Sequence, residues 1–145
     1  MSNTVADLRS LLATALSGVS GWRESTSAPG IFGTDPQPSM HKSFAVGIAE
    51  TSVPTTEGRH VNSAAGVLAE TTAEVRWGYL LRADAQVTDH TAALTAEAAL
   101  VKACCGVPRS GGVKVRLDRA QRETSQSGWL LGTLRFRVIH QLPTA

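Results

Sequence analysis

Four histidines and two cysteines are the side chains best suited to metal or nucleophilic chemistry in this 145-residue chain. Cys104 and Cys105 are neighbours, and a helix points successive side chains about 100° apart, so a bridge between them would strain the backbone. We interpret them as free thiols at the end of a half-buried helix, which favours a reducing compartment such as a cytoplasm. The histidines fall in four different predicted elements, without a partner at a recognised metal-ligand spacing: His41, His60, His90 and His140.

The chain carries none of the short motifs that mark common catalytic sites. GxSxG, GxGxxG, GxxxxGK[ST] and HExxH are all absent. The acids Asp84, Asp89, Glu97 and Asp118 form no obvious pair, and we expect Glu97 to partner an arginine of the sheet. The sequence therefore predicts a protein that is not an enzyme and that has no cofactor or metal. A small-ligand site, or a metal site assembled only in three dimensions, stays open.

Composition indicates one globular domain spanning residues 1–145. Apolar residues make up 42% and charged residues 18%, and the formal net charge is +2. So small a charge gives no support to nucleic-acid binding, which needs a concentrated basic surface. No stretch approaches the roughly 20 apolar residues that span a bilayer. We interpret the N-terminal run as an amphipathic helix over residues 4–17, capped by Thr4 or Asn3, and not as a signal peptide.

The strongest periodic signals lie between Glu74 and Gly106. Residues 74–82 alternate as a strand and place Trp77 and Tyr79 on its core face. A helix over about residues 88–105 follows, with Thr88 or Asp89 as its cap and Gly106 as its end. The apolar stripe expected to pack this helix on the core has helical spacing: Leu94, Ala98, Val101 and Cys105.

Three further strands are expected at residues 42–49, 113–119 and 129–142. Residues 50–73 are expected to form a long flexible loop, and residues 119–128 a polar turn. The element order is α-β-β-α-β-β. Consecutive strands without a crossover helix pair as hairpins, so we predict an α+β fold with a mostly antiparallel four-stranded sheet. Two helices pack on one face of this sheet.

Arginines gather on the sheet face that the helices leave uncovered. An RNA-binding sheet needs exposed aromatics among its basic residues, and here Trp77 and Tyr79 lie on the opposite face. Because arginine is enriched at protein interfaces, a contact between subunits of a homo-oligomer fits better. The arginines assigned to this interface are Arg76, Arg82, Arg116, Arg135 and Arg137.

Several stretches resemble the tail terminator proteins of long-tailed bacteriophages, the lambda U-like minor tail protein family. The similarity rests on HKSFAVGI, on EVRWGYLLRADAQVTDHTAALTAEAALVKA and on the closing pair KVRLDR and GWLLGTLRFRVIHQL. It covers most of the chain in layout, except residues 50–73.

This resemblance implies a structural virion protein of the tail and neck, assembled in the host cytoplasm. Hexameric rings of the family cap the tail tube, end its polymerisation and join the tail to the head-side connector. Its partners would be its own copies, the tail tube protein and a connector or stopper protein, with DNA only as cargo in the lumen and no membrane. The alternatives are another head–tail joining protein (a stopper) and, less favoured, a nucleic-acid-binding or small-ligand-binding domain.

A ring needs heterologous contacts, in which one patch meets a different patch on the neighbour. The family's contacts are not fixed by a motif, so the two patches come from the residues themselves. We expect the arginine face to form one side. The acids in and beside the predicted loop are expected to form the other: Glu50, Glu57, Glu70 and Glu74.

Overall fold

The computed structural model describes residues 4–25, 41–53, 66–107, 113–125 and 128–142, with the short pairs 55–56, 59–60 and 62–63. Two helices, α1 (Val5–Ser17) and α2 (Gln86–Cys105), accompany four principal strands, β2 (Ser43–Ser52), β6 (Gly66–Leu80), β7 (Lys114–Thr124) and β8 (Trp129–Leu142). Four strands of two residues complete the described part: β1 (Arg23–Glu24), β3 (Thr55–Thr56), β4 (Arg59–His60) and β5 (Asn62–Ser63). Neither described helix is both long and apolar enough to cross a membrane.

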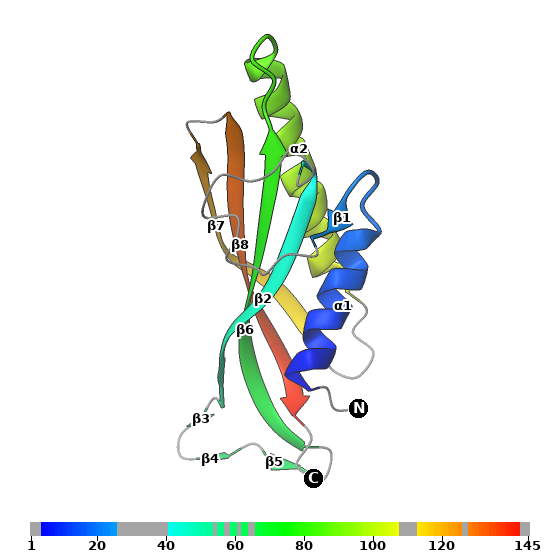
Figure 1. The fold of residues 1–145 in the computed structure, drawn as a ribbon. Helices are drawn as coiled ribbons and strands as arrows, with labels where there is room; N and C mark the ends of the chain where they lie inside the picture. The colour runs from blue at the N-terminus through cyan, green and yellow to red at the C-terminus, as the bar shows by residue number, and fades with distance from the viewer. Residues whose placement is uncertain are drawn as a thin grey trace.

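The principal strands form an antiparallel sheet in the order β2-β6-β8-β7. This part of the prediction is confirmed, as is the α+β class. The sheet is nevertheless mixed, because β1 adds to β2 in parallel at the edge. In addition, β5 pairs with the start of β6 in antiparallel orientation. Figure 1 shows β6 and β8 running along most of the length of the molecule, with α2 beginning at the upper end.

Both helices pack on the same face of the sheet, as expected. Their buried residues join one hydrophobic cluster with the inward side chains of β2, β6 and β8. Trp77 lies at its centre with no exposed surface, and Tyr79 is buried beside it. Trp22 packs edge-on against Trp77, with ring centroids 6.0 Å apart. These aromatics belong to the core, as the alternation in residues 74–82 predicted.

Helix α1 begins as its sequence indicates. The Thr4 hydroxyl accepts a hydrogen bond from the Asp7 backbone N–H, and the Asp7 carboxylate accepts one from the Thr4 N–H. This reciprocal capping box satisfies two backbone donors that the first turn would otherwise leave unpaired.

Helix α2 is rotated by one residue from its prediction. Its buried side chains are Asp89, Ala93, Glu97, Leu100 and Cys104, whereas Ala98 and Cys105 are exposed. Leu94 and Val101 lie at the margin of the core. The helix also starts earlier, with Ala85 as a cap that makes no side-chain hydrogen bond, so neither Thr88 nor Asp89 caps it. Asp89 and Glu97 are turned inward because each meets an arginine: Arg82, just after the end of β6, and Arg122 on β7.

The long loop expected at residues 50–73 is wrong at both ends. Strand β2 continues to Ser52, and β6 begins at Gly66. The inward residues of this first part of β6 are small or polar, so they give little hydrophobic alternation: Ala69, Thr71 and Ala73, none of them exposed. The Thr71 hydroxyl is hydrogen-bonded to His140 Nε2 at 2.7 Å and to the Thr51 hydroxyl at 2.9 Å, which offsets the cost of burying it.

The polar turn expected at residues 119–128 is also wrong over its first half, since β7 continues to Thr124. As an edge strand, β7 is largely exposed on both faces and needs no apolar alternation. On its inner face Arg122 Nε donates to both carboxylate oxygens of Glu97, at 3.0 and 2.9 Å. The expected partnership of Glu97 with a sheet arginine is therefore confirmed.

Candidate functional site: the outer face of the sheet

The face of the sheet opposite α1 and α2, here called the outer face, carries most of the predicted interface residues. Residues that pair across antiparallel strands share a face, so the register places each side chain. No described helix packs on this side. Its charged residues are Glu50 on β2, Glu70, Glu74 and Arg76 on β6, Arg135 and Arg137 on β8, and Lys114, Arg116, Asp118, Arg119 and Glu123 on β7.

Two pairs of arginines face each other across β7 and β8. Arg116 lies directly opposite Arg137, and Arg119 lies opposite Arg135. Like charges in directly opposed positions destabilise an antiparallel pair. The sheet therefore keeps four guanidinium groups together at a cost to the isolated domain.

Acids placed among these arginines offset part of that repulsion. Asp118 sits where the β7–β8 register shifts, and its carboxylate lies 3.4 Å from Arg137 Nε and 4.0 Å from Arg135 Nε. Glu70 approaches Arg137 Nη1 at 3.5 Å. The Arg137 side chain keeps 45% of its surface exposed, so these pairs are solvent-screened and weakly stabilising.

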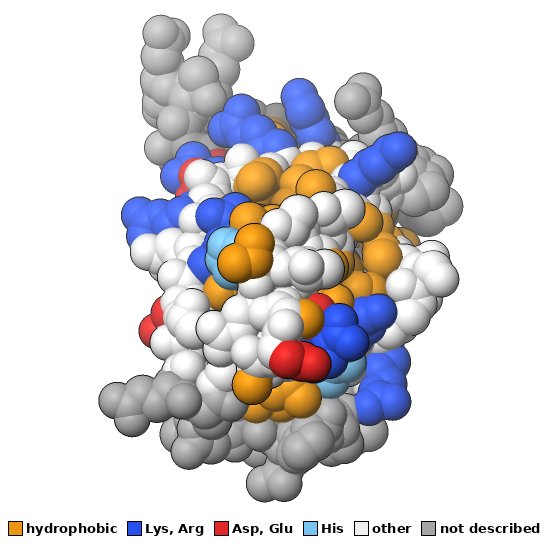
Figure 2. All heavy atoms as spheres, turned by 90° about the horizontal axis from the view of Figure 1, so that it is seen from above, with side chains coloured by type: hydrophobic (Ala, Val, Ile, Leu, Met, Phe, Trp, Pro, Cys, Tyr) orange, Lys and Arg blue, Asp and Glu red, His pale blue; other side chains and the backbone are white. Residues whose placement is uncertain are grey.

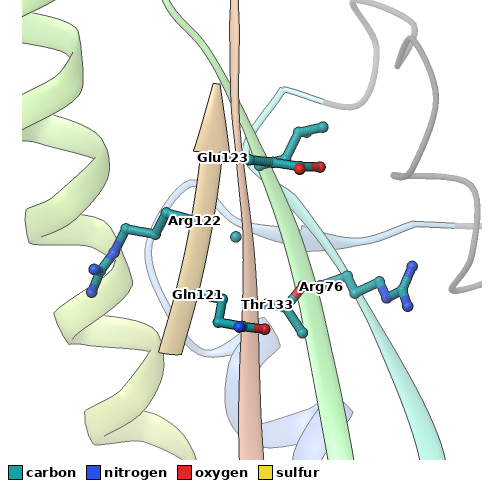
Figure 3. A pocket seen from close by; sticks show the side chains of 7 residues that line it. Arg76, Gln121, Arg122, Glu123 and Thr133 are labelled. Atoms are coloured by element: carbon teal, nitrogen blue, oxygen red, sulfur yellow. The ribbon is translucent and has the colours of Figure 1, made fainter. Parts of the chain in front are cut away.

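A shallow hollow of about 360 Å³ lies on the same face, over β6, β8 and β7. Gln121 and Thr133, which are opposed in the register, face one another there (Figure 3). Arg76 lies at its border, with its guanidinium directed away from the hollow and 3.8 Å from Glu74. Arg122 points in the opposite direction, toward α2. Glu123 is the carboxylate among the described residues that line the hollow.

The structure brings together four of the five predicted arginines on the outer face, namely Arg76, Arg116, Arg135 and Arg137. Arg82 does not belong to them, because β6 ends at Leu80 and the Arg82 side chain turns to α2. Its backbone N–H donates to Asp89 Oδ2 at 2.8 Å, and its Nε and Nη2 donate to the same carboxylate at 3.0 Å. Hydrogen bonds from Arg82 lower the pKa of Asp89, and Asp89 in turn raises the pKa of Arg82.

The predicted acids do not form a separate second patch. Glu50 and Glu70 lie on the outer face together with the arginines, and so does Glu74. The division into an arginine surface and an acidic loop surface is therefore wrong for these three. The prediction failed because residues 50–52 and 66–73, which were expected to be loop, belong to β2 and β6 and share the sheet with the arginine-bearing strands. Glu57 lies outside the described residues.

Sequence reasoning missed a small apolar cluster on the outer face. Ala45, Trp129 and Leu131 are buried there, with Leu80 packed against them. Leu80 and Leu131 interrupt the alternation of their strands, since apolar residues follow one another in YLL and WLL. Such a local break is the signal of a strand segment that is buried on both faces.

Fold and site together define a small α+β domain whose sheet presents a charged face to the outside. Among the described residues no group of three or more His, Cys, Asp or Glu side chains is placed to hold a metal ion. No protein-family model matches the chain, and no curated protein matches it significantly.

Proposed function

We propose that this protein is a structural component of a phage virion, a tail terminator that assembles as a ring on the tail tube. The observation that carries the proposal is the opposition of arginines across β7 and β8, where Arg116 faces Arg137 and Arg119 faces Arg135. Within an isolated monomer, Asp118 and Glu70 offset only part of the repulsion between these arginines. An acidic surface of another subunit, laid on the outer face, would supply the missing countercharge.

The distribution of charge over the outer face also supports contacts between copies. Its β7–β8 half carries five cationic residues against the acids Asp118 and Glu123, whereas its β2–β6 half carries the acids Glu50, Glu70 and Glu74 against Arg76. A neighbour displaced by about two strands would set its acidic half against the basic half of the first subunit. Such a displaced contact is heterologous, the kind of contact that forms a ring when its rotation closes.

In this proposal the protein acts in the neck of the virion and is assembled in the host cytoplasm. It ends tail polymerisation, meets the tail tube protein on one side and a connector or stopper protein on the other, and passes DNA only as cargo. No catalytic step is assigned to it. A stopper protein of the head–tail junction is the alternative within the same class.

Electron microscopy of phage tails made with and without the protein tests this function. A terminator predicts tails of uncontrolled length without the protein and regulated tails with it. A stopper instead predicts tails of normal length that fail to join heads. Regulated tails joined normally to heads in its absence would exclude both.

The outer face is tested in the same assay with a double charge reversal, Arg135→Glu with Arg137→Glu. We expect loss of tail-length control, because the basic half becomes acidic. The matched control is Lys102→Glu, a charge reversal at an exposed position in the last turn of α2. If the double variant assembled like the control, the outer face would not be the contact surface.

A further inference from the structure

A second cavity, also of about 360 Å³, lies at the end of the molecule where α2 begins. Three elements converge on it: the turn before β2, the end of β6 and the first turns of α2. Figure 2 looks onto this end, where Lys and Arg side chains predominate over acidic ones. The described residues that line the cavity are His41, Lys42, Tyr79, Leu80, Arg82 and Asp89.

His41 is held in one tautomer. Its Nδ1 accepts a hydrogen bond from the Leu80 backbone N–H at 3.0 Å, so in the neutral ring Nε2 carries the proton. The imidazole also packs edge-on against Tyr79, with ring centroids 4.7 Å apart. The ring is therefore fixed from two sides and offers a hydrogen-bond donor at Nε2.

Two cationic side chains accompany this donor. Lys42 has a backbone φ of 56°, which is uncommon for a residue other than glycine, and its ammonium lies 5.9 Å from the centre of the Tyr79 ring. Arg82 engages Asp89 through Nε and Nη2, so Nη1 takes no part in that pair. Both Asp89 oxygens accept from Arg82, which balances the charge of the one carboxylate among the described lining residues.

The charged groups near His41 give its surroundings a positive field. Burial and then the neighbouring Lys42 lower its pKa, with Arg23 acting in the same direction and Asp89 opposing. Lys42 and Arg23 together outweigh the one nearby acid that favours the charged ring. A negatively charged group placed in the cavity would find this field favourable.

We propose that this cavity binds a single oxyanion, a carboxylate or a phosphate group, through the Lys42 ammonium, Arg82 and the His41 Nε2–H donor. These are the donors that such anions prefer, and hydrogen bonds to ionised groups are the stronger ones. The volume suits a small acid or one acidic side chain. The site needs no ring and is independent of the function proposed above.

NMR titration of the whole chain with inorganic phosphate, at constant ionic strength, tests the site. We expect saturable shifts of the His41 ring and of the Leu80 amide, together with a rise in the pKa of His41 as the anion offsets the positive field. Shifts that grow linearly without saturation would show only non-specific screening and would overturn the proposal.

Two variants separate the site from general surface charge. Lys42→Gln and Arg82→Gln should each weaken phosphate binding about tenfold, since each removes one charge-assisted contact. Lys102→Gln, which removes an exposed charge from the last turn of α2, should leave the affinity unchanged. Equal effects of all three substitutions on phosphate affinity would overturn the proposal. Lys42→Gln keeps the test valid if Arg82→Gln disturbs the fold by leaving Asp89 without its partner.

The source of the oxyanion is separated by a dilution series without phosphate. If an acidic side chain of a second copy occupies the cavity, the His41 shifts should appear as protein concentration rises and should reverse when phosphate competes. If the ligand is a free anion, the spectrum without phosphate should not change with protein concentration.

Discussion

At the scale of single residues, His41 makes the stability of the fold depend on pH. Its pKa in the folded chain lies below the ordinary value of 6.5, first because of burial and then because of Lys42. The unfolded chain therefore binds the proton at higher pH than the folded chain does. The stabilisation is complete above about pH 6.5 and is lost as the pH falls from there through the folded-state pKa.

We expect His41→Asn to flatten this dependence, because the amide oxygen of asparagine can accept the Leu80 N–H without titrating. The measurement is the urea midpoint between about pH 5 and pH 7, the range in which histidine titrates. His90→Asn, at an exposed position on α2, is the control and should follow the parent chain. An unchanged slope in His41→Asn would contradict the assignment.

Gly132 is a second residue whose identity the fold requires. It pairs with Trp77 across β6 and β8, and an added Cβ would stand 2.1 Å from the Trp77 indole. Trp77 is fully buried and cannot move aside freely. We expect Gly132→Ala to lower the free energy of unfolding by about 1–3 kcal/mol, as overpacking does. Chemical denaturation measures this, and a loss no larger than that of the exposed Gly18→Ala would contradict it.

At the scale of elements, much of the fold could be predicted because apolar side chains alternate wherever a strand covers the core. Phe44 and Val46 in β2, and Trp77 and Tyr79 in β6, gave this signal. The first part of β6 could not be found in this way, because Ala69 and Ala73 are small and Thr71 is polar. Its burial depends on His140 and on packing from distant parts of the chain, which local sequence does not reveal.

Helix α2 was harder to orient because alanines give it two overlapping apolar stripes. Only Asp89 and Glu97 distinguish the two, and each is turned inward by an arginine, one just after β6 and one on β7. Composition alone assigns acids to the solvent side. The same limit applies to the candidate site. Alternation along the strand correctly predicted the face of Arg135 and Arg137. It assigned Arg82 to that face wrongly, because alternation does not show that β6 ends at Leu80.

The orientation of α2 has a chemical test in its two thiols. Cys104 is fully buried, and burial, followed by the charge of Cys105, raises its pKa to about 12. Cys105 is exposed. Because the thiolate is the reactive form, iodoacetamide should label Cys105 alone in the folded chain and both thiols after denaturation. Peptide mapping by mass spectrometry identifies the labelled cysteine. As a control, the folded Cys105→Ser variant should stay unlabelled. Labelling of Cys104 at a rate similar to that of Cys105 would contradict the orientation of α2.

At the scale of the whole molecule, the two faces of the sheet differ in what holds them. The inner face is covered by α1 and α2 and contains the main core, whereas the outer face combines a small apolar cluster with opposed charges. The inner face therefore accounts for most of the stability of the domain. If the charges of the outer face serve the proposed assembly, substitutions among them should change assembly more than they change stability.

A charge exchange between Glu70 and Arg137, whose side chains approach to 3.5 Å, separates these two properties. Arg137→Glu alone removes the repulsion from Arg116 but breaks the pairs with Glu70 and Asp118 and sets three acids close together, so it should cost at most about 1 kcal/mol of stability, the scale of exposed ion pairs. Adding Glu70→Arg restores an opposite-charge pair and should recover part of that loss in thermal unfolding. It should not restore tail-length control, because a neighbour would still meet an acid where the basic half requires an arginine. Recovery of stability and tail-length control together would mean that the arginine serves only its own fold.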